Sequence, residues 1–151
     1  MEMFKKFKGA IDKAQNIVIT THLFPDADGI GAEISLCLAL NKFGKNAICC
    51  NQEPLLDRYK YLDPQDSVVG LEELPNRYKE SPDLVIVVDT NTVHRTGDKM
   101  KEYVMGLDCP VFYIDHHPCS EALQDDHCID TTAAATGQLV GHLIQDLGIP
   151  F

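Results

Sequence analysis

Residues 17–32 decide the fold, and they read Ile-Val-Ile-Thr-Thr-His-Leu-Phe-Pro-Asp-Ala-Asp-Gly-Ile-Gly-Ala. A short β-branched run enters a loop with one histidine and two aspartates, and a long apolar helical pattern follows. This order predicts a strand, a polar loop and the start of a helix. In a parallel α/β sheet such loops leave the carboxyl edge of the strands, where small-molecule and metal sites collect.

Further apolar runs have the length and composition of buried strands. The expected strands are 17–21, 46–51, 84–88 and 111–114, and helical spacing predicts helices over 3–14, 29–43, 98–105 and 133–147. Residues 53–83 contain several prolines, and we expect peripheral structure there with short helical segments near 55–62 and 71–79. The sequence therefore predicts one domain over residues 1–151, a doubly wound, mainly parallel α/β fold with helices on both faces of the sheet.

Composition limits the partners and the compartment. The 151-residue chain has a formal charge of −10, which argues against an extended duplex-binding surface, because such surfaces are basic and release counterions. No run reaches the ~18 apolar residues of a membrane span, and the N-terminus lacks the apolar core of a signal peptide. The six cysteines show no Cys-x-x-Cys spacing, which indicates reduced thiols. We expect a cytoplasmic protein without membrane contact, and a homodimer stays open.

Acidic and imidazole side chains follow three of the expected strands. They are His22, Asp26 and Asp28 after the first, Asp89 after the third, and Asp115, His116 and His117 after the fourth. Two carboxylates ~4 Å apart repel by roughly 4 kcal/mol at a moderate effective dielectric, so this cluster would be unfavourable without cations. Two divalent ions that share a carboxylate would reverse that effect, and they are typical of phosphate ester hydrolysis. Mixed imidazole and carboxylate ligands favour Mn²⁺, with Mg²⁺, Co²⁺ and Zn²⁺ as alternatives.

Each motif also has a purely structural interpretation. Aspartate and glycine are common in loops, an aspartate after a strand often caps the next turn, and paired histidines are often surface residues. The position of all three motifs at the same edge of the sheet favours the metal site.

The motifs resemble those of the DHH phosphoesterases, in the same order along the chain. They are His22-x3-Asp26-x-Asp28-x2-Gly31, Val88-Asp89-Thr90 and Asp115-His116-His117. A small-residue stretch at 132–137 is similar to the helix start that follows in many members. The resemblance implies a catalytic centre with two metal ions, usually Mn²⁺. One ion would be held by His22, Asp26 and Asp89, and the other by Asp28, Asp89 and His116.

The resemblance also implies roles for the remaining polar residues. Asp115 would orient His116, and both Asp115 and His117 would belong to the catalytic machinery, with His117 facing the phosphate as a donor or acid. Within the family, Arg95-Thr96-Gly97 after the second motif is most similar to the branch of oligoribonucleases and adenosine bisphosphate phosphatases. Arg95 is therefore a candidate for binding the substrate phosphate, together with His117.

The implied function is hydrolysis of phosphodiester or phosphomonoester bonds in short oligonucleotides or small nucleotides. Two alternatives stay open, a nucleotide-binding or regulatory module without turnover and an inorganic pyrophosphatase of the same superfamily. Family members typically carry a further metal-binding aspartate well past the Asp-His-His motif and then a substrate-binding domain, and neither is found here. We therefore expect a chain truncated before both, and little activity from the 151 residues alone.

Overall fold

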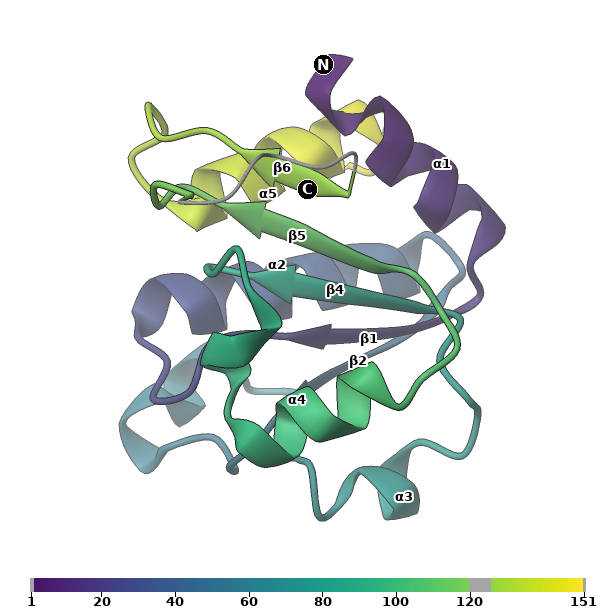
Figure 1. Cartoon of the computed structure of the whole chain (residues 1–151), viewed down its shortest axis with the longest axis vertical. Coiled ribbons are helices and arrows are strands. Elements are labelled where there is room, and N and C mark those ends of the chain that lie inside the picture. Colours follow the sequence, from purple (N-terminus) through teal and green to yellow (C-terminus); the bar gives the residue numbers. More distant parts are fainter. Residues whose placement is uncertain (1, 120–125, 151) are drawn as a thin grey trace.

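The computed structural model describes residues 2–119 and 126–150, and its centre is a sheet of six parallel strands (Figure 1). The strand order is β3-β2-β1-β4-β5-β6. The strands are β1 (Asn16–Thr20), β2 (Asn46–Asn51), β3 (Val68–Gly70), β4 (Leu84–Val88), β5 (Val111–Asp115) and β6 (His127–Ile129). The mainly parallel α/β fold that the sequence predicts is thus confirmed.

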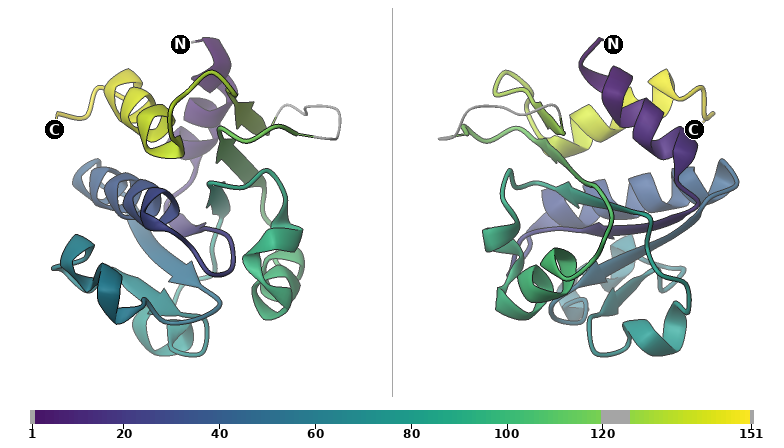
Figure 2. Two further views of the ribbon diagram at one scale, coloured as in Figure 1. Left: turned by 90° about the vertical axis from the view of Figure 1, so that its left-hand side faces the viewer. Right: turned by 45° about the vertical axis from the view of Figure 1, so that its right-hand side comes forward.

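Helices cover both faces of this sheet, as Figure 2 shows. They are α1 (Lys5–Lys13), α2 (Ala27–Lys42), α3 (Leu74–Arg77), α4 (Asp98–Met105) and α5 (Thr136–Asp146), with 3₁₀ turns at Glu2–Phe4, Asp57–Leu62 (η2) and Val93–Thr96 (η3). Buried side chains of α1, α2 and α5 form one apolar core against the sheet, and those of α3 and α4 form another on the opposite face.

Strand β1 shows why the sequence folds this way. Ile17 and Ile19 belong to the core under α2, whereas Val18 between them belongs to the core under α4. All three side chains are fully buried. Successive side chains of a strand point to opposite faces, so a continuous apolar run is what a strand covered on both sides requires.

The structure differs from the expected elements mainly at the edges of the sheet. Strands β3 and β6 lie outside the expected set, and each is only three residues long. Helix α2 begins at Ala27 rather than at residue 29, and α5 begins at Thr136 rather than at residue 133. The four central strands and the helix over Asp98–Met105 agree with the expectation.

The strand order places a topological switch point between β1 and β4. The chain runs outward from β1 through β2 to β3, returns beside β1 as β4, and continues outward through β5 to β6. Ligands of doubly wound sheets bind in the crevice at the carboxyl ends of such strands. The loops that carry His22 and Asp89 leave the sheet at this point. No helix in the described part of the chain has the length and apolar character to cross a membrane.

Candidate metal centre

His22 lies in the loop between β1 and α2 with its ring orientation fixed by the backbone. Its Nδ1 lies 2.9 Å from the carbonyl oxygen of Leu23, which can only accept, so Nδ1 carries the proton. Nε2 then has a free lone pair, and it faces Oδ2 of Asp89 at 3.5 Å. This arrangement is typical of metal-binding histidines, whose second nitrogen donates to a carbonyl or carboxylate.

Asp26 and Asp28 both lie at the start of α2, but they are held differently. Asp26 caps the helix, because its Oδ1 accepts from the backbone N–H of Asp28 at 2.9 Å and of Gly29 at 3.2 Å. This cap explains why the helix begins two residues earlier than the apolar pattern indicates. Asp28 reaches the first turn of α5 instead, where Thr136 N and Gly137 N each donate to one of its oxygens at 2.8 Å.

Asp89 stands directly after β4 and is almost fully buried, with 1% of its surface exposed. Its φ is 61°, a left-handed conformation that is uncommon outside glycine. Oδ1 accepts a 2.8 Å hydrogen bond from the Thr136 hydroxyl. Oδ2 is buried and has no hydrogen-bond partner among the described residues.

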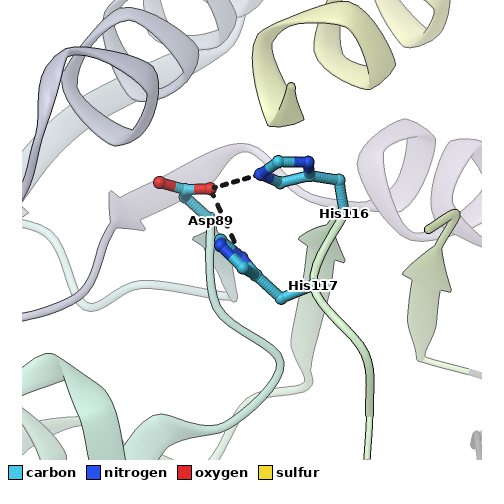
Figure 3. Close-up of side chains that lie close together, drawn as sticks. All are labelled: Asp89, His116 and His117. Carbon is cyan, nitrogen blue, oxygen red and sulfur yellow. Dashed lines mark ion pairs between the residues drawn. The ribbon is translucent and has the colours of Figure 1, made fainter. Parts of the chain in front are cut away.

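The Asp-His-His motif follows β5 and brings two imidazoles to the same carboxylate (Figure 3). His116 Nε2 and His117 Nδ1 each lie 3.8 Å from Asp89 Oδ1. His116 Nδ1 faces the carbonyl oxygen of Ala133 at 3.3 Å, so its Nε2 is also the free nitrogen, and it lies 3.6 Å from Asp28 Oδ2. His116 therefore presents a lone pair between the two aspartates.

The expected role of Asp115 differs from the one that the structure shows. Asp115 does not orient His116, because its Oδ1 lies 2.8 Å from Nδ1 of His117, while its Oδ2 accepts from Asn91 Nδ2 at 2.8 Å. The Asp115 carboxylate is fully buried, whereas the His117 side chain is 44% exposed. A carboxylate at Nδ1 fixes the tautomer and leaves Nε2 of His117 for solvent or a ligand.

These side chains form two groups that could each hold a metal ion, and both contain Asp89. One group is His22, Asp26 and Asp89, and the other is Asp89, His116 and His117, with the ligand atoms of each within 4.8 Å of one another. Such spacings suit atoms that surround one ion at bonds of about 2.1 Å. A cation would also satisfy the buried Oδ2 of Asp89, which is otherwise unfavourable to bury. The residues therefore fit a metal centre.

The charges within the cluster are already coupled without metal. The nearby carboxylate of Asp89 raises the pKa of His22, although burial opposes the rise. Burial alone would raise the pKa of Asp89, but the nearby imidazole of His22 and the hydrogen bond from Thr136 outweigh it and lower that pKa. The cluster thus stabilises a negative carboxylate at its centre, which is what a cation requires.

Arg95 is exposed in η3, close to the loop that carries His22. Its backbone carbonyl accepts from Leu23 N at 2.6 Å. Its positive charge acts on His22 in the direction that lowers the pKa of that imidazole. Arg95 therefore borders the centre and takes no part in either group of ligand atoms.

Sequence reasoning missed Thr136, Gly137 and Asn91 as parts of the site. Thr136 touches both Asp28 and Asp89, and Asn91 holds Asp115. The small-residue stretch at 132–137 was the available signal for a helix start, but its hydrogen bonds to Asp28 come from backbone N–H groups, which no residue type reveals.

Comparison with known proteins shows which family the chain is similar to. Residues 16–150 match the model of the DHH family, N-terminal domain. The bifunctional oligoribonuclease and PAP phosphatase NrnA of Thermus thermophilus is 30% identical over 138 residues, which is 88% of this chain and 37% of that protein. The cyclic-di-AMP phosphodiesterase GdpP of Bacillus subtilis is 28% identical over 149 residues, or 91% of this chain and 22% of that one.

A solved structure supports the fold. An exopolyphosphatase-related protein from Bacteroides fragilis aligns with a TM-score of 0.84 at 23% identity, covering 98% of this chain and 44% of that chain. The chain spans less than half the length of these relatives.

Proposed function

Because the chain belongs to the DHH family and matches the N-terminal domain of that family, we propose that it is part of a phosphoesterase that uses two divalent metal ions. Its substrates would be phosphodiester or phosphomonoester bonds of short oligonucleotides or small nucleotides. The observation that carries the proposal is the place of Asp89, whose carboxylate is common to both groups of ligand atoms. A shared carboxylate is the usual feature of a two-metal hydrolytic centre.

We assign the first ion to His22, Asp26 and Asp89. The free Nε2 of His22 and the unpartnered Oδ2 of Asp89 support this assignment. We assign the second ion to Asp28, Asp89 and His116, since Nε2 of His116 faces both carboxylates. Asp28 replaces His117 of the second group in this assignment, because Nδ1 of His117 is bonded to Asp115. Both oxygens of Asp28 already accept backbone hydrogen bonds, so we expect the second ion to bind more weakly.

His117 is assigned to the substrate side of the centre. Asp115 accepts from its Nδ1 and would stabilise the protonated imidazolium, whose Nε2 could then donate a hydrogen bond or a proton to a phosphate oxygen. Bound ions would polarise the phosphoryl oxygens and lower the pKa of a water molecule. Arg95, at the border, would add a positive charge for the substrate phosphate.

The substrate class follows from the relatives and from the charge of the chain. NrnA and GdpP are named for oligoribonucleotides, PAP and cyclic-di-AMP. A formal charge of −10 suits a small phosphate substrate better than a long polyanion. The mixed imidazole and carboxylate set favours Mn²⁺. The six cysteines are free, which supports our placement of the protein in the cytoplasm.

The test is hydrolysis by the chain at stoichiometric concentration with Mn²⁺, using a dinucleotide, an adenosine bisphosphate, a cyclic dinucleotide and pyrophosphate. We expect only slow nucleotide cleavage, in line with the little activity expected of the 151 residues alone, and His117→Ala should reduce its rate by about 100-fold or more, as for loss of a general acid. Asp108→Asn, an exposed change before β5 at the opposite edge of the sheet, is the control.

Other outcomes would contradict the proposal in distinct ways. Preferred turnover of pyrophosphate would indicate an inorganic pyrophosphatase. Tight Mn²⁺ and nucleotide binding with no product at all would indicate a binding module.

A further inference from the structure

A cavity of about 500 Å³ lies beside the candidate metal centre, at the carboxyl ends of β1 and β2. Its walls are the loop from His22 to Pro25, one residue of α2, and residues 51–57 together with Tyr59. His22 lines this cavity and also belongs to a group of metal-ligand atoms. The volume is in the range of small-molecule sites, about 300–1,000 Å³.

We propose that this cavity binds the nucleobase and sugar of the substrate, with the phosphate of the same molecule at the metal centre. The inference rests on the proposed function. It concerns the nucleobase and sugar, which the metal centre does not bind. It is supported by the chemistry of the lining, by the conformation of one aromatic residue and by the position of the cavity.

The lining is suited to an uncharged ring. Apolar side chains dominate it, among them Phe24, Ile30, Leu55 and Leu56. No lysine or arginine is among the described residues that line the cavity. A second phosphate or a polyphosphate chain would need such cations, so the occupant is the part of the substrate without charge.

Phe24 is 79% exposed, more than any other large apolar residue that the structure describes. Its φ of 53° is in the left-handed region, which is unfavourable for an aromatic residue. The neighbouring Leu23 N–H donates to the carbonyl of Arg95 at 2.6 Å, which ties this loop to η3. A strained backbone that presents an aromatic face to solvent beside a site is suited to stacking on a base.

Polar groups at the cavity supply hydrogen bonds for the edge of a base. Gln52 is held in place because its Oε1 accepts from Lys99 N at 3.0 Å. Its Nε2 lies 3.5 Å from Glu53 Oε1, a long contact that a ligand can replace. The carboxamide of Gln52 can donate a hydrogen bond to a ring nitrogen of a base. The carboxylate of Glu53 beside it can accept a hydrogen bond from an exocyclic amine of the same base.

The first experiment uses adenosine without metal, so that it does not depend on the metal centre. Binding is followed by NMR chemical shifts of the backbone amides, with ribose as the ligand that lacks the base. We expect adenosine to shift the amides of residues 23–24, 52–53 and 55–57, and ribose to shift none of them. Phe24→Ala should weaken adenosine binding about tenfold or more through loss of stacking, and Phe24→Tyr should retain it.

Phe43→Ala is the matched control, because Phe43 is also exposed, at 43%, but ends α2 away from the cavity. Equal shifts with adenosine and ribose, or equal affinity of Phe24→Ala and wild type, would overturn the proposal. A dimer that dissociates in Phe24→Ala, without adenosine binding, would also overturn it and assign the cavity to a second copy of the chain. Mn²⁺ binding is measured separately, so its failure would contradict the metal centre while leaving the adenosine result to decide this inference.

Discussion

Asp89 holds its position against unfavourable local energetics. A left-handed φ in a non-glycine residue is unfavourable by of order 1–3 kcal/mol, and its carboxylate is buried with one oxygen unpartnered. Thr136, His22 and the backbone bond from Asp89 N to Ile114 O hold it there. Such a residue is expected at a site whose ligand provides the missing stabilisation.

Thr136 provides the first prediction at this scale. Its hydroxyl is the donor that positions Oδ1 of Asp89, so Thr136→Val removes the bond while keeping the shape of the side chain. We expect the Mn²⁺ affinity of Thr136→Val to fall by about 10–100-fold. Calorimetric titration checks it, with Thr136→Ser as the variant that keeps the hydroxyl. Equal Mn²⁺ affinity in the Val and Ser variants would refute this role.

At the residue scale the sequence predicted which acidic and imidazole side chains lie together better than it predicted their hydrogen-bond partners. Asp89 and His116 were predictable because they follow apolar strands at one edge of the sheet. The pairing of Asp115 with His117 rather than His116 was not predictable, because it depends on ring rotations within one loop. Asn91 depends on a similar side-chain orientation.

At the scale of elements, the start of α2 must approach the centre closely. A Cβ on Gly29 would lie 2.5 Å from Thr21 Oγ1 and 3.3 Å from Asp89 Oδ2, whereas one on Gly31 would meet nothing within 4 Å. Gly29→Ala should therefore lower the free energy of unfolding by about 1–3 kcal/mol. Gly31→Ala, in the same helix, should raise it by about 0.5–1 kcal/mol. Urea unfolding measures both, and equal effects would contradict this packing.

Glu33 gives α2 a pH-dependent contact with β2. It is fully buried and accepts from Asn51 Nδ2 at 2.8 Å, and burial raises its pKa well above the ordinary value of 4.5. The folded state then holds a proton that the unfolded state has lost. This contribution to stability is complete below pH 4.5 and declines as the pH rises through the folded pKa.

Glu33→Gln should remove this pH dependence. Relative to wild type, the free energy of unfolding of the variant should improve steadily as the pH rises from 5 toward 9, in metal-free buffer. Unfolding in urea at several pH values measures the difference, with the exposed Glu80→Gln as control. A constant difference between wild type and Glu33→Gln over this range would show that Glu33 ionises normally.

The central elements were predictable and the peripheral ones were not, for a physical reason. Strand β4 is buried on both faces, so its apolar run is unambiguous. Strands β3 and β6 are the two edge strands of the sheet. Each pairs with one neighbour over three residues, and segments this short carry no periodic pattern. The start of α5 was misplaced because Thr136 N and Gly137 N bond to Asp28, a contact from a distant part of the chain.

At the scale of the whole molecule, the topology concentrates negative charge at the switch point. Metal binding to the folded state alone should therefore stabilise the molecule. Saturating Mn²⁺, at about 100 times its Kd, adds about 2.7 kcal/mol, which should raise Tm by roughly 5–10 °C for a domain of this size. Thermal unfolding followed by circular dichroism measures the shift, and EDTA should reverse it. An unchanged Tm with saturating Mn²⁺ would contradict metal binding by the folded chain.

The central claim is that Asp89 belongs to both ion sites, and it is tested most directly by titrating Mn²⁺ and following the free ion by electron paramagnetic resonance. We predict that wild type and Asp108→Asn bind Mn²⁺ at two sites, one tighter than the other, in line with the two groups that share Asp89. Asp89→Asn should lose both. Retention of either site at wild-type affinity in Asp89→Asn would contradict the shared carboxylate and the two-metal centre built on it.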